Sequence, residues 1–583
     1  MSRISEYDKF PVIPVQSVGN CAWQGWRSIV EHIRSQVPKG ARRLAIECYP
    51  GVFEDEISAA FSEALAPIQV LRVRDGYKSP REIEAMTSRE LTDDPVFGRM
   101  NGFVIKDFVD PVRTASLRQQ LSRNPDDVTL VIGTGTSLFE PNPDILIYAD
   151  LPRWEIQQRQ RSNKIFNLAI ENRHESAGLR YKRGYFLDWR MADRIKKELL
   201  GKIDFLLDTT DPDTPKMVTG DAFRAALRLA TTRPFRVVPF FDPGPWGGQW
   251  MREVCGLDAE SPNYAWCFDC VPEENSLRFE FGNVVIEVPA INLVFQHPRE
   301  LLGDAVHERF GTEFPIRFDF LDTMDGGNLS LQVHPLTEYI QEKFGIAYTQ
   351  DESYYLLDAA PDACVYLGVK SNIDREQMGR ELHHAQEDGT WFDADKYVNK
   401  WPARRHDHFL IPAGTIHCSG RNSMVLEISA TPYIFTFKLW DWGRPGLDGK
   451  PRPIHLDHGL ANIQWNRDTE WVKDNLINRI CVVARGPGWT EERTGLHTSE
   501  FIETRRHWFE SPVIHENRGS VHVLNLVEGK AAVIDSPDHS FDEFVVHYAE
   551  TFIVPAAVEK YRVRPLNSDT KCATIRASVR TGS

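Results

Sequence analysis

The sequence has 583 residues, of which 42% are hydrophobic and 26% are charged, an ordinary balance for a soluble globular protein. This length is long for one hydrophobic core, so we expect roughly two to four domains. The net charge of −15 argues against nucleic acid or an anionic membrane surface as the main partner. An anionic substrate would therefore have to be met by a local basic patch.

Two features of the sequence bear on the cellular compartment. The first residues, Met1 to Lys9, lack the apolar core of a signal peptide, and no stretch has the apolar length needed to span a bilayer. The nine cysteines are scattered, and their odd number favours reduced thiols. We predict a cytoplasmic protein. Cys267-Phe-Asp-Cys270 is a CxxC motif without a second pair, so we expect two cysteines packed in a strand.

Residues 25 to 230 alternate between strand-like and helix-like segments. The apolar runs Leu44 to Cys48, Val128 to Gly133 and Ile145 to Asp150 predict buried strands. Apolar periodicity predicts helices over Glu56 to Leu65 and Arg153 to Glu171. This alternation is typical of an α/β domain with a parallel sheet, which we place at residues 1–235.

The run from Asp144 to Arg159 resembles a late strand and helix of P-loop nucleoside-kinase-like folds. A phosphate-binding loop, however, is missing after Ile46, where the sequence continues with Glu47-Cys-Tyr-Pro-Gly-Val-Phe-Glu-Asp-Glu56. Gly133-Thr-Gly135 has no lysine and predicts a tight turn. We interpret the domain as a degenerate kinase-like module with a role in assembly or regulation.

A Pro/Gly-rich passage from Pro234 to Gly248 marks the next boundary. Beyond it, Leu277 to Val294 alternates β-forming residues and predicts the first sheet of a β-barrel. Pro298 to Phe310, Leu336 to Gly345 and Ile373 to Glu387 predict helices inserted between strands.

The stretch from Asn328 to Glu427 carries side chains suited to a metal. On a strand, Ser330, Gln332 and His334 point to one face, which we expect to be polar and wet. Glu352 opens another strand-like run, and His417 follows a Pro/Gly turn. Imidazole nitrogen combined with carboxylate and amide oxygen suits zinc or its first-row neighbours and leaves positions open for substrate.

The spacing leaves an alternative open, because ligands on separate strands have no fixed separation. His334 and His417 would then be ordinary strand histidines with hydrogen-bond partners. Other histidines are left out of the predicted site: His383 and His384 are adjacent in a helix and diverge by about 100°. We also leave out His406 and His408.

Several motifs occur in the order of a known family. They are Pro245-Trp-Gly-Gly248, Arg309-Phe-Gly-Thr-Glu-Phe-Pro315, Gln332-Val-His-Pro335, Asp351-Glu-Ser-Tyr-Tyr-Leu-Leu357, Val365-Tyr-Leu-Gly368, Ile411-Pro-Ala-Gly-Thr-Ile-His417, Val425-Leu-Glu-Ile428, Trp440-Asp-Trp-Gly-Arg444 and Ile454-His-Leu456. This set resembles the type I mannose-6-phosphate isomerases over about residues 236 to 583. The resemblance implies a mainly-β double cupin with helical insertions, following the α/β domain.

The resemblance also implies domain limits. Residues 236–460 would form the catalytic cupin, and residues 461–583 a second cupin barrel. The second barrel lacks the His-Glu-His ligands, so we expect it to be structural, with His522 a packed strand residue.

What the resemblance implies about the site can be stated by residue. The metal, expected to be one Zn²⁺ per chain, would be held by Gln332, His334, Glu352 and His417. Catalytic roles would fall to Glu427, Lys438 and Arg444, and substrate-binding roles to Ser330, Lys438, Arg444 and His455. Two departures stand out, because Lys438 replaces an arginine and Gln350 replaces a lysine that many members have.

The implied activity is the interconversion of mannose 6-phosphate and fructose 6-phosphate through a cis-enediol. The partner would be a small phosphosugar, with no nucleic acid and no membrane, and the oligomeric state stays open. Two alternatives remain at this point: a non-catalytic phosphosugar-binding sensor, and a metal-dependent cupin enzyme of other chemistry, such as an oxygenase.

Overall fold

The computed structural model describes residues 5–16, 19–36, 42–65, 69–123, 128–430, 435–495, 497, 500–567 and 570–581. The chain divides into two compact units. The α/β unit comprises Val12–Ala230 and Ser276–His297, and the β unit comprises Met1–Pro11, Thr231–Asn275 and Pro298–Ser583. The prediction that Met1 to Lys9 is not a signal peptide falls partly outside the described residues, because these begin at Ser5.

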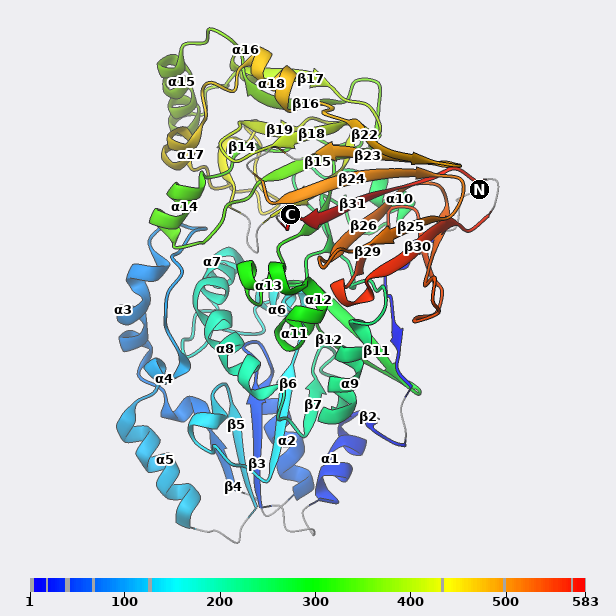
Figure 1. Ribbon diagram of the computed structural model, residues 1–583. Coiled ribbons are helices and arrows are strands. Elements are labelled where there is room, and N and C mark those ends of the chain that lie inside the picture. The colour runs from blue at the N-terminus through cyan, green and yellow to red at the C-terminus, as the bar shows by residue number, and fades with distance from the viewer. Residues whose placement is uncertain are drawn as a thin grey trace. The chain divides into compact units, whose positions relative to one another are not determined.

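A mostly parallel sheet forms the centre of the α/β unit (Figure 1). Its strands, in spatial order, are β2 (Ala22–Gln24), β8 (Lys216–Thr219), β7 (Phe205–Asp208), β6 (Ile145–Asp150), β3 (Arg43–Cys48), β5 (Thr129–Gly133) and β4 (Gln69–Arg72). β3 to β7 are parallel, while β8 and β2 are antiparallel additions at one edge. Leu44, Ala45 and Ile46 are all fully buried, as expected of a strand covered on both faces. The three predicted strands are confirmed.

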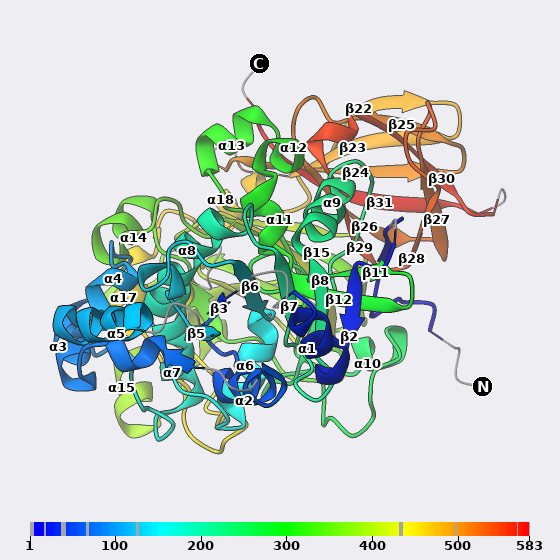
Figure 2. The same ribbon diagram turned by 90° about the horizontal axis from the view of Figure 1, so that it is seen from below.

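Helices flank this sheet (Figure 2). They are α1 (Trp26–Arg34), α2 (Glu54–Leu65), α3 (Pro80–Leu91), α4 (Ile105–Phe108), α5 (Pro111–Arg123), α6 (Arg153–Arg161), α7 (Ala177–Arg183), α8 (Trp189–Leu199), α9 (Gly220–Ala230) and α11 (Ile291–Gln296). The predicted helix over Arg153 to Glu171 is too long. It ends at Arg161 because Asn163 has a φ of 56°, a left-handed conformation that terminates a helix.

The predicted tight turn after β5 is confirmed. Gly133 and Gly135 have φ values of 134° and 93°. The carboxylate of Glu47 accepts hydrogen bonds from the Gly135 amide at 2.5 Å and from the Thr136 hydroxyl at 2.7 Å. A carboxylate of the chain itself therefore occupies the donors of this turn.

The hairpin that follows Asn275 belongs to the α/β unit. β11 (Ser276–Phe281) pairs with β12 (Val284–Pro289) and with β1 (Ile13–Pro14). The Glu287 amide donates to Asp208 Oδ2 at 2.8 Å, and the Asn292 side chain donates to Asp150 Oδ2 at 2.9 Å. The prediction that Leu277 to Val294 starts the barrel is therefore wrong, because alternation identifies strands but does not identify their partners.

In the β unit, two sheets face each other around the stretch from Asn328 to Glu427. One sheet contains, in order, β18 (His408–Ile411), β15 (Glu352–Ala359), β20 (Ser423–Ser429), β13 (Arg317–Asp322), β10 (Trp266–Cys270) and β9 (Phe240–Asp242). The other contains β17 (Val398–Pro402), β16 (Cys364–Val369), β19 (His417–Ser419), β14 (Leu331–Val333) and β21 (Phe437–Trp440). Cys267 and Cys270 are free, buried residues of β10, as predicted.

Helices are inserted between these strands. They are α10 (Trp250–Val254), α12 (Pro298–Leu302), α13 (Asp304–Phe310), α14 (Thr337–Phe344), α15 (Arg375–Asp388), α16 (Ala394–Tyr397), α17 (Leu456–Asn462) and α18 (Thr469–Asn475). The predicted helix over Pro298 to Phe310 is interrupted at Gly303, which has a φ of 90°. A Cβ atom there would lie 1.9 Å from the Gly519 carbonyl oxygen, so this close approach requires glycine.

A second pair of sheets follows Leu476. One contains β22 (Cys481–Gly486), β23 (Trp489–Gly495), β24 (Ile502–Phe509), β31 (Cys572–Val579), β26 (His522–Glu528) and β29 (Thr551–Val554). The other contains β25 (Val513–Glu516), β30 (Lys560–Pro565), β27 (Ala531–Asp535) and β28 (Phe544–His547). These two sheets lie where a second barrel was expected, whereas the division at residue 460 stays a prediction.

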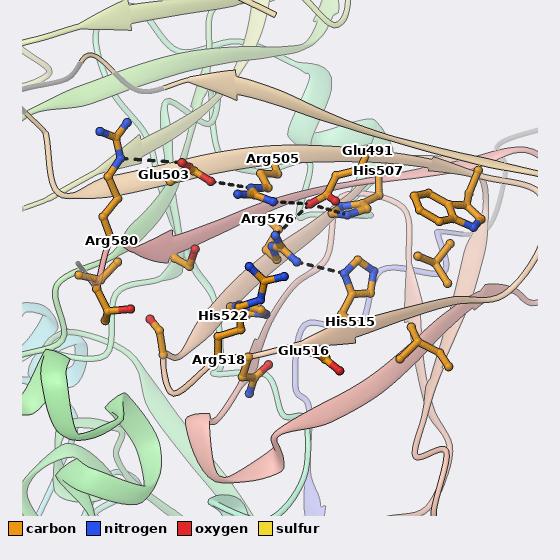
Figure 3. Close-up of a pocket in the computed structure, with 18 residues that line it drawn as sticks. Glu491, Glu503, Arg505, His507, His515, Glu516, Arg518, His522, Arg576 and Arg580 are labelled. Atoms are coloured by element: carbon orange, nitrogen blue, oxygen red, sulfur yellow. Dashed lines mark hydrogen bonds and ion pairs between the residues drawn. The ribbon is translucent and has the colours of Figure 1, made fainter. Parts of the chain in front are cut away.

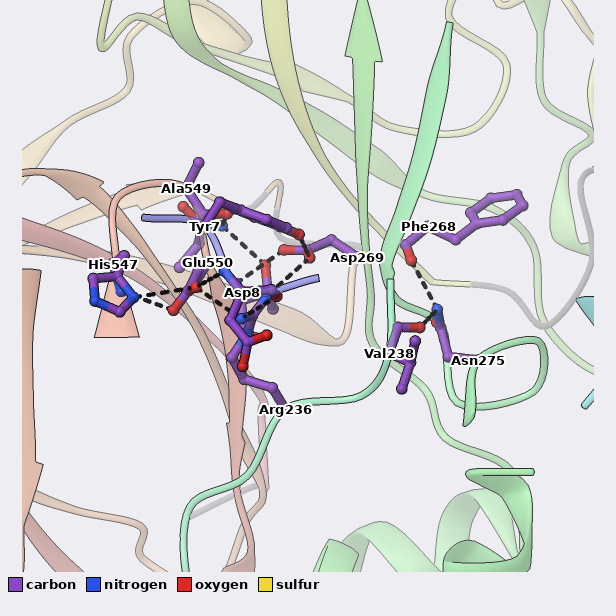
Figure 4. Close-up of polar contacts among 12 residues, drawn as sticks. Tyr7, Asp8, Arg236, Val238, Phe268, Asp269, Asn275, His547, Ala549 and Glu550 are labelled. Carbon is purple, nitrogen blue, oxygen red and sulfur yellow. Dashed lines mark hydrogen bonds and ion pairs between the residues drawn. The ribbon is translucent and has the colours of Figure 1, made fainter. Parts of the chain in front are cut away.

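Buried polar contacts hold the N-terminal residues in the β unit (Figure 4). The Tyr7 hydroxyl donates to Asp269 Oδ1 at 2.5 Å, and the Asp8 amide donates to Glu550 Oε1 at 2.6 Å. Arg236 Nη1 lies 2.9 Å from Glu550 Oε1. Three segments distant in sequence are thus joined by one charged cluster.

In the described part of the chain, no helix combines the length and apolarity required to cross a membrane.

Candidate metal centre

Sheet pairing places the predicted ligands in one row. Gln332 of β14 pairs with His417 of β19 on one side and with Lys438 of β21 on the other. Cross-strand partners point to the same face of a sheet, so these side chains are neighbours. His334 follows two residues after Gln332, and Glu352 begins β15 in the facing sheet.

His334, Glu352 and His417 meet at close range and are each fully buried. Nε2 of His334 lies 3.1 Å from Oε2 of Glu352, and Nε2 of His417 lies 2.9 Å from Oε1 of the same carboxylate. One ligand atom from each residue lies within 4.8 Å of the other two. The side-chain amide of Gln332 adjoins them, 3.2 Å from Nε2 of His417. The structure therefore brings all four predicted ligands together.

Main-chain carbonyl groups fix the orientation of both rings. Nδ1 of His334 lies 2.8 Å from the Phe435 carbonyl oxygen, and Nδ1 of His417 lies 2.8 Å from that of Thr415. A carbonyl oxygen accepts, so Nδ1 carries the hydrogen in each ring. When the rings are neutral, their Nε2 lone pairs therefore point at the Glu352 carboxylate.

This donor set fits a divalent cation. Among the described residues, Oε1 of Glu352 and Nε2 of His334 have no hydrogen-bond partner, and buried lone pairs facing a carboxylate repel one another. Ligand atoms around a tetrahedral zinc ion lie about 3.4 Å apart when the bonds are about 2.1 Å long. The observed distances of 3.1 and 2.9 Å are somewhat shorter than this value.

The carboxylate of Glu352 and the imidazole of His334 shift each other's pKa values toward the charged forms. Burial opposes ionisation of Glu352, but the two imidazoles outweigh it and hold the pKa of Glu352 well below its usual range. Burial likewise lowers the pKa of His334, but the adjacent carboxylate outweighs it, so that the pKa of His334 is raised. The cluster therefore contains an ionised carboxylate ready for a positive partner.

Glu427 lies beside this cluster on the facing sheet. It pairs with Tyr354 of β15 and with Asp319 of β13, so its side chain shares a face with Glu352. Burial, and then the charge of Glu352, raise the pKa of Glu427 well above its usual range. Glu427 therefore holds its proton more strongly than an ordinary glutamate does.

A basic patch adjoins the row on the other side. Asp441 accepts hydrogen bonds from Arg444 Nη2 at 2.8 Å and from Ser330 Oγ at 2.9 Å. Arg452 Nη1 lies 3.1 Å from the second Asp441 oxygen. Burial, and then Arg452, lower the pKa of Lys438 to about 7. Two arginines thus contact one carboxylate, and Lys438 lies close enough to sense the charges of all three.

Two members of this site were missed by sequence reasoning in these roles. Gln350 donates from Nε2 to Oε2 of Glu352 at 2.9 Å, so it orients the carboxylate of this predicted ligand. Arg452 lies in the loop between β21 and α17, and its position eight residues after Arg444 gives no periodic signal. Its neighbours Ser330 and Asp441 become apparent in the folded chain.

His455, the remaining predicted site residue, is buried, and its amide donates to the Lys438 carbonyl at 2.9 Å, which places it beside the basic patch. Two of the histidines that we left out of the predicted site lie outside the cluster: His406 hydrogen bonds to Tyr355 and Glu528, and His383 belongs to helix α15.

One expectation about this face is wrong. Ser330, Gln332 and His334 do share a polar face, but their exposed fractions are 1%, 7% and 0%, so the face is buried rather than wet. The facing sheet covers it, and sequence alternation does not reveal a second layer.

Comparisons with known proteins match two parts of the chain. Residues 25–232 match a family described as a domain of unknown function, DUF8485. The mannose-6-phosphate isomerase ManA of Bacillus subtilis is 26% identical over 234 residues, which are 40% of this chain and 69% of that protein. The Streptococcus mutans mannose-6-phosphate isomerase is 28% identical over 217 residues, 37% of this chain and 63% of that protein.

A solved structure of mannose 6-phosphate isomerase from Bacillus subtilis aligns with 59% of this chain and 99% of its own, at 18% identity and a TM-score of 0.49. The C-terminal part of this chain is homologous to mannose-6-phosphate isomerases over about 40% of the chain's length.

Proposed function

We propose that this chain is a metal-dependent aldose-ketose isomerase that interconverts mannose 6-phosphate and fructose 6-phosphate. The observation that carries the proposal is the convergence of two Nε2 atoms, with tautomers fixed by main-chain carbonyl groups, on the Glu352 carboxylate. The homology described above supports an isomerase. We further propose a double cupin for the β unit, a kinase-like ancestry for the α/β unit, and a cytoplasmic location.

In this proposal, Gln332, His334, Glu352 and His417 hold one divalent cation, expected to be Zn²⁺. A bound cation polarises a sugar carbonyl as a Lewis acid and stabilises negative charge on the neighbouring oxygen.

The reaction moves a proton between C1 and C2 of the sugar through a cis-enediol, so a positioned side chain has to exchange it. Lys438 lies in the same row as Gln332. Glu427 lies beside Glu352, and both belong to the sheet that faces this row. Lys438 and Glu427 flank the ligands and are the candidates for contact with the reacting carbons.

The substrate phosphate carries nearly two negative charges at neutral pH. Arg444 and Arg452, both anchored on Asp441, supply planar donors for its oxygens. Ser330 contacts the same carboxylate, and His455 borders Lys438, so both have places at the edge of this subsite.

The test combines metal content with turnover. Zinc-loaded wild-type protein should equilibrate mannose 6-phosphate with fructose 6-phosphate and contain about one metal ion per chain. Glu352→Gln and His417→Ala should lose both properties because each removes a ligand, whereas Glu338→Gln on the exposed side of α14 should retain them.

Three results would contradict the proposal. Wild-type protein that binds metal but leaves the two sugars unequilibrated is not this isomerase. Metal content unchanged in both ligand variants would show that the ion lies elsewhere. Turnover retained in both variants would separate activity from the cluster.

A further inference from the structure

The C-terminal pair of sheets encloses a polar cavity of about 760 Å³ (Figure 3). A volume of this size suits a small-molecule ligand. Strand alternation lines it: Glu503, Arg505 and His507 follow one another at every second position of β24 and share a face. We expected this part of the chain to be structural, with His522 a packed strand residue. His522 is buried as expected, but it also lines the cavity.

The cavity carries more positive than negative charge. Arg505 and Arg576 are direct cross-strand partners, an arrangement of like charges that is destabilising by itself. Glu491 Oε1 lies between them, 2.9 Å from Arg505 Nη1 and 3.2 Å from Arg576 Nη2. Arg518 and Arg580 also line the cavity. Four guanidinium groups thus face two carboxylates, since the third lining carboxylate, Glu516, is paired with Lys560.

The histidines present hydrogen-bond donors in this cavity. Arg576 Nη1 lies 3.1 Å from Nδ1 of His515, and because a guanidinium donates, Nδ1 accepts and Nε2 carries the hydrogen of the neutral ring. His515 is 3% exposed, and its Nε2 atom has no hydrogen-bond partner among the described residues. An unpaired buried donor in a cavity wall indicates a missing acceptor.

The hydrogen-bond partner of His522 also fixes which ring nitrogen carries the hydrogen. Its Nδ1 lies 2.9 Å from the Tyr561 hydroxyl, which in turn interacts with Arg576. The hydroxyl accepts from the guanidinium and donates to the ring, so Nε2 of His522 carries a hydrogen. Burial, together with nearby positive charge, holds the pKa of both His515 and His522 well below the usual range, so both rings are neutral donors.

We propose that this cavity is a second ligand site, separate from the metal centre, that binds a small molecule through a phosphate or carboxylate group. Arg505, Arg576 and the Nε2 hydrogen of His515 would donate to the oxygens of the anion. Arg518 and Arg580 would supply charge at the entrance. Guanidinium groups beside the imidazoles disfavour a cation, so the set is one for an oxyanion rather than for a metal.

Hydrogen exchange measured by mass spectrometry tests the proposal on the full chain, because it reports locally. A hexose 6-phosphate, the corresponding sugar acid and the uncharged hexose are added separately. Slower exchange, by about threefold or more, is expected in residues 502–522 and 572–581 with at least one of the two anions, and no change is expected with the hexose. Protection by the phosphate, by the carboxylate or by both identifies the anion that the site accepts.

Two sets of variants locate the effect. Arg518→Gln removes a charge from an exposed loop residue, and Arg576→Gln combined with Glu491→Gln removes a paired charge without leaving a buried carboxylate unbalanced. The double variant should raise the apparent dissociation constant for the anion by about tenfold or more, which corresponds to one charge-assisted hydrogen bond. Arg518→Gln should raise it by a smaller factor, because Arg518 contributes charge without a hydrogen bond. Arg564→Gln, a matched control, alters an arginine paired with Asp535 outside the cavity lining and should bind as wild type does.

The outcomes are decisive in either direction. Absence of protection in these segments with both anions would overturn the proposal, as would equal protection by the uncharged hexose. Unchanged binding by Arg518→Gln and by the double variant would also overturn it. The same measurement on Glu352→Gln separates this site from the metal centre, because protection here should persist in that variant. Protection that is lost in Glu352→Gln would overturn the proposal.

Discussion

At the scale of single residues, the candidate metal centre depends on groups that touch the ligands. Gln350 donates to one oxygen of Glu352, while two carbonyl groups hold the Nδ1 atoms of His334 and His417. Such outer contacts fix the direction of the ligand lone pairs. An uncharged amide at position 350 is suited to this task because it donates without adding a positive charge next to the ion.

Replacing Gln350 with methionine should weaken metal binding. Methionine preserves the approximate volume but removes the donor to Glu352, and loss of such a contact lowers metal affinity by about 10- to 100-fold. Titration of metal-free protein with zinc in the presence of a competing chelator measures the change. Gln341→Met, at an exposed residue of α14, is the control. Equal affinities in the two variants would exclude an orienting role for Gln350.

Arg452 should act on substrate binding more than on turnover. We expect Arg452→Gln to raise KM for mannose 6-phosphate by about tenfold or more, because a charge-assisted hydrogen bond contributes about 1.5–3 kcal/mol. The value of kcat should change much less. Steady-state kinetics measure both quantities, and Arg421→Gln, which removes an exposed surface ion pair, is the control. A fall in kcat at constant KM would assign Arg452 a different role.

At the scale of elements, strand register decides which side chains meet. β14 brings Gln332 between His417 and Lys438, and a shift of β14 by one residue would turn Gln332 away from the centre. β18 contributes to the opposite sheet and carries His408, which is fully buried. Burial, and then the charge of Arg506, lower the pKa of His408 to about 3.

His408 should make the protein sensitive to acid. Its folded pKa lies below its unfolded value of about 6.5, so the unfolded chain binds the proton more readily. The stabilising contribution is present above pH 6.5 and is lost as the pH falls toward 3. At pH 5 the loss should reach about 2 kcal/mol.

Urea denaturation at pH 7.5 and pH 5, followed by circular dichroism, compares wild-type protein with His408→Leu. The free energy of unfolding should fall by about 2 kcal/mol more in the wild type than in the variant. An identical pH dependence of the two proteins would mean that His408 does not remain neutral in the folded state.

At the scale of the whole molecule, each of the two units is built from segments that are separated in the sequence. The β unit includes residues at the N-terminus, and the α/β unit includes Ser276–His297. β12 packs on β2, β7 and β8, and its apolar residues Ile286 and Val288 are buried there. A cut near residue 231 therefore separates each unit from one of its own segments.

Removing residues 1–230 should accordingly destabilise what remains. The truncated chain loses the Tyr7 hydroxyl that bonds to Asp269, and it exposes the apolar side of the β11–β12 hairpin. We expect aggregation or a lower thermal midpoint than the β unit shows in the full chain, measured by size-exclusion chromatography and scanning calorimetry. A soluble truncated chain with an unchanged midpoint would contradict this expectation.

The sequence by itself determined the elements whose pattern is local. β3, β5 and β6 follow from apolar runs, α2 and α15 from periodicity, and the turn at Gly133 and Gly135 from the need for positive φ. The four proposed metal ligands could also be identified from the sequence, since the affinity of imidazole, carboxylate and amide groups for a metal ion is a property of the side chain itself.

The tertiary structure decided which elements and side chains are in contact with one another. It assigned the hairpin after Asn275 to the α/β unit, buried the face of Ser330, and brought Arg452 to Asp441 across a loop. It also assembled a charged cavity from strands that had looked structural. The physical reason is that periodicity records which side of an element is covered, whereas the identity of the covering partner depends on contacts between residues far apart in the chain.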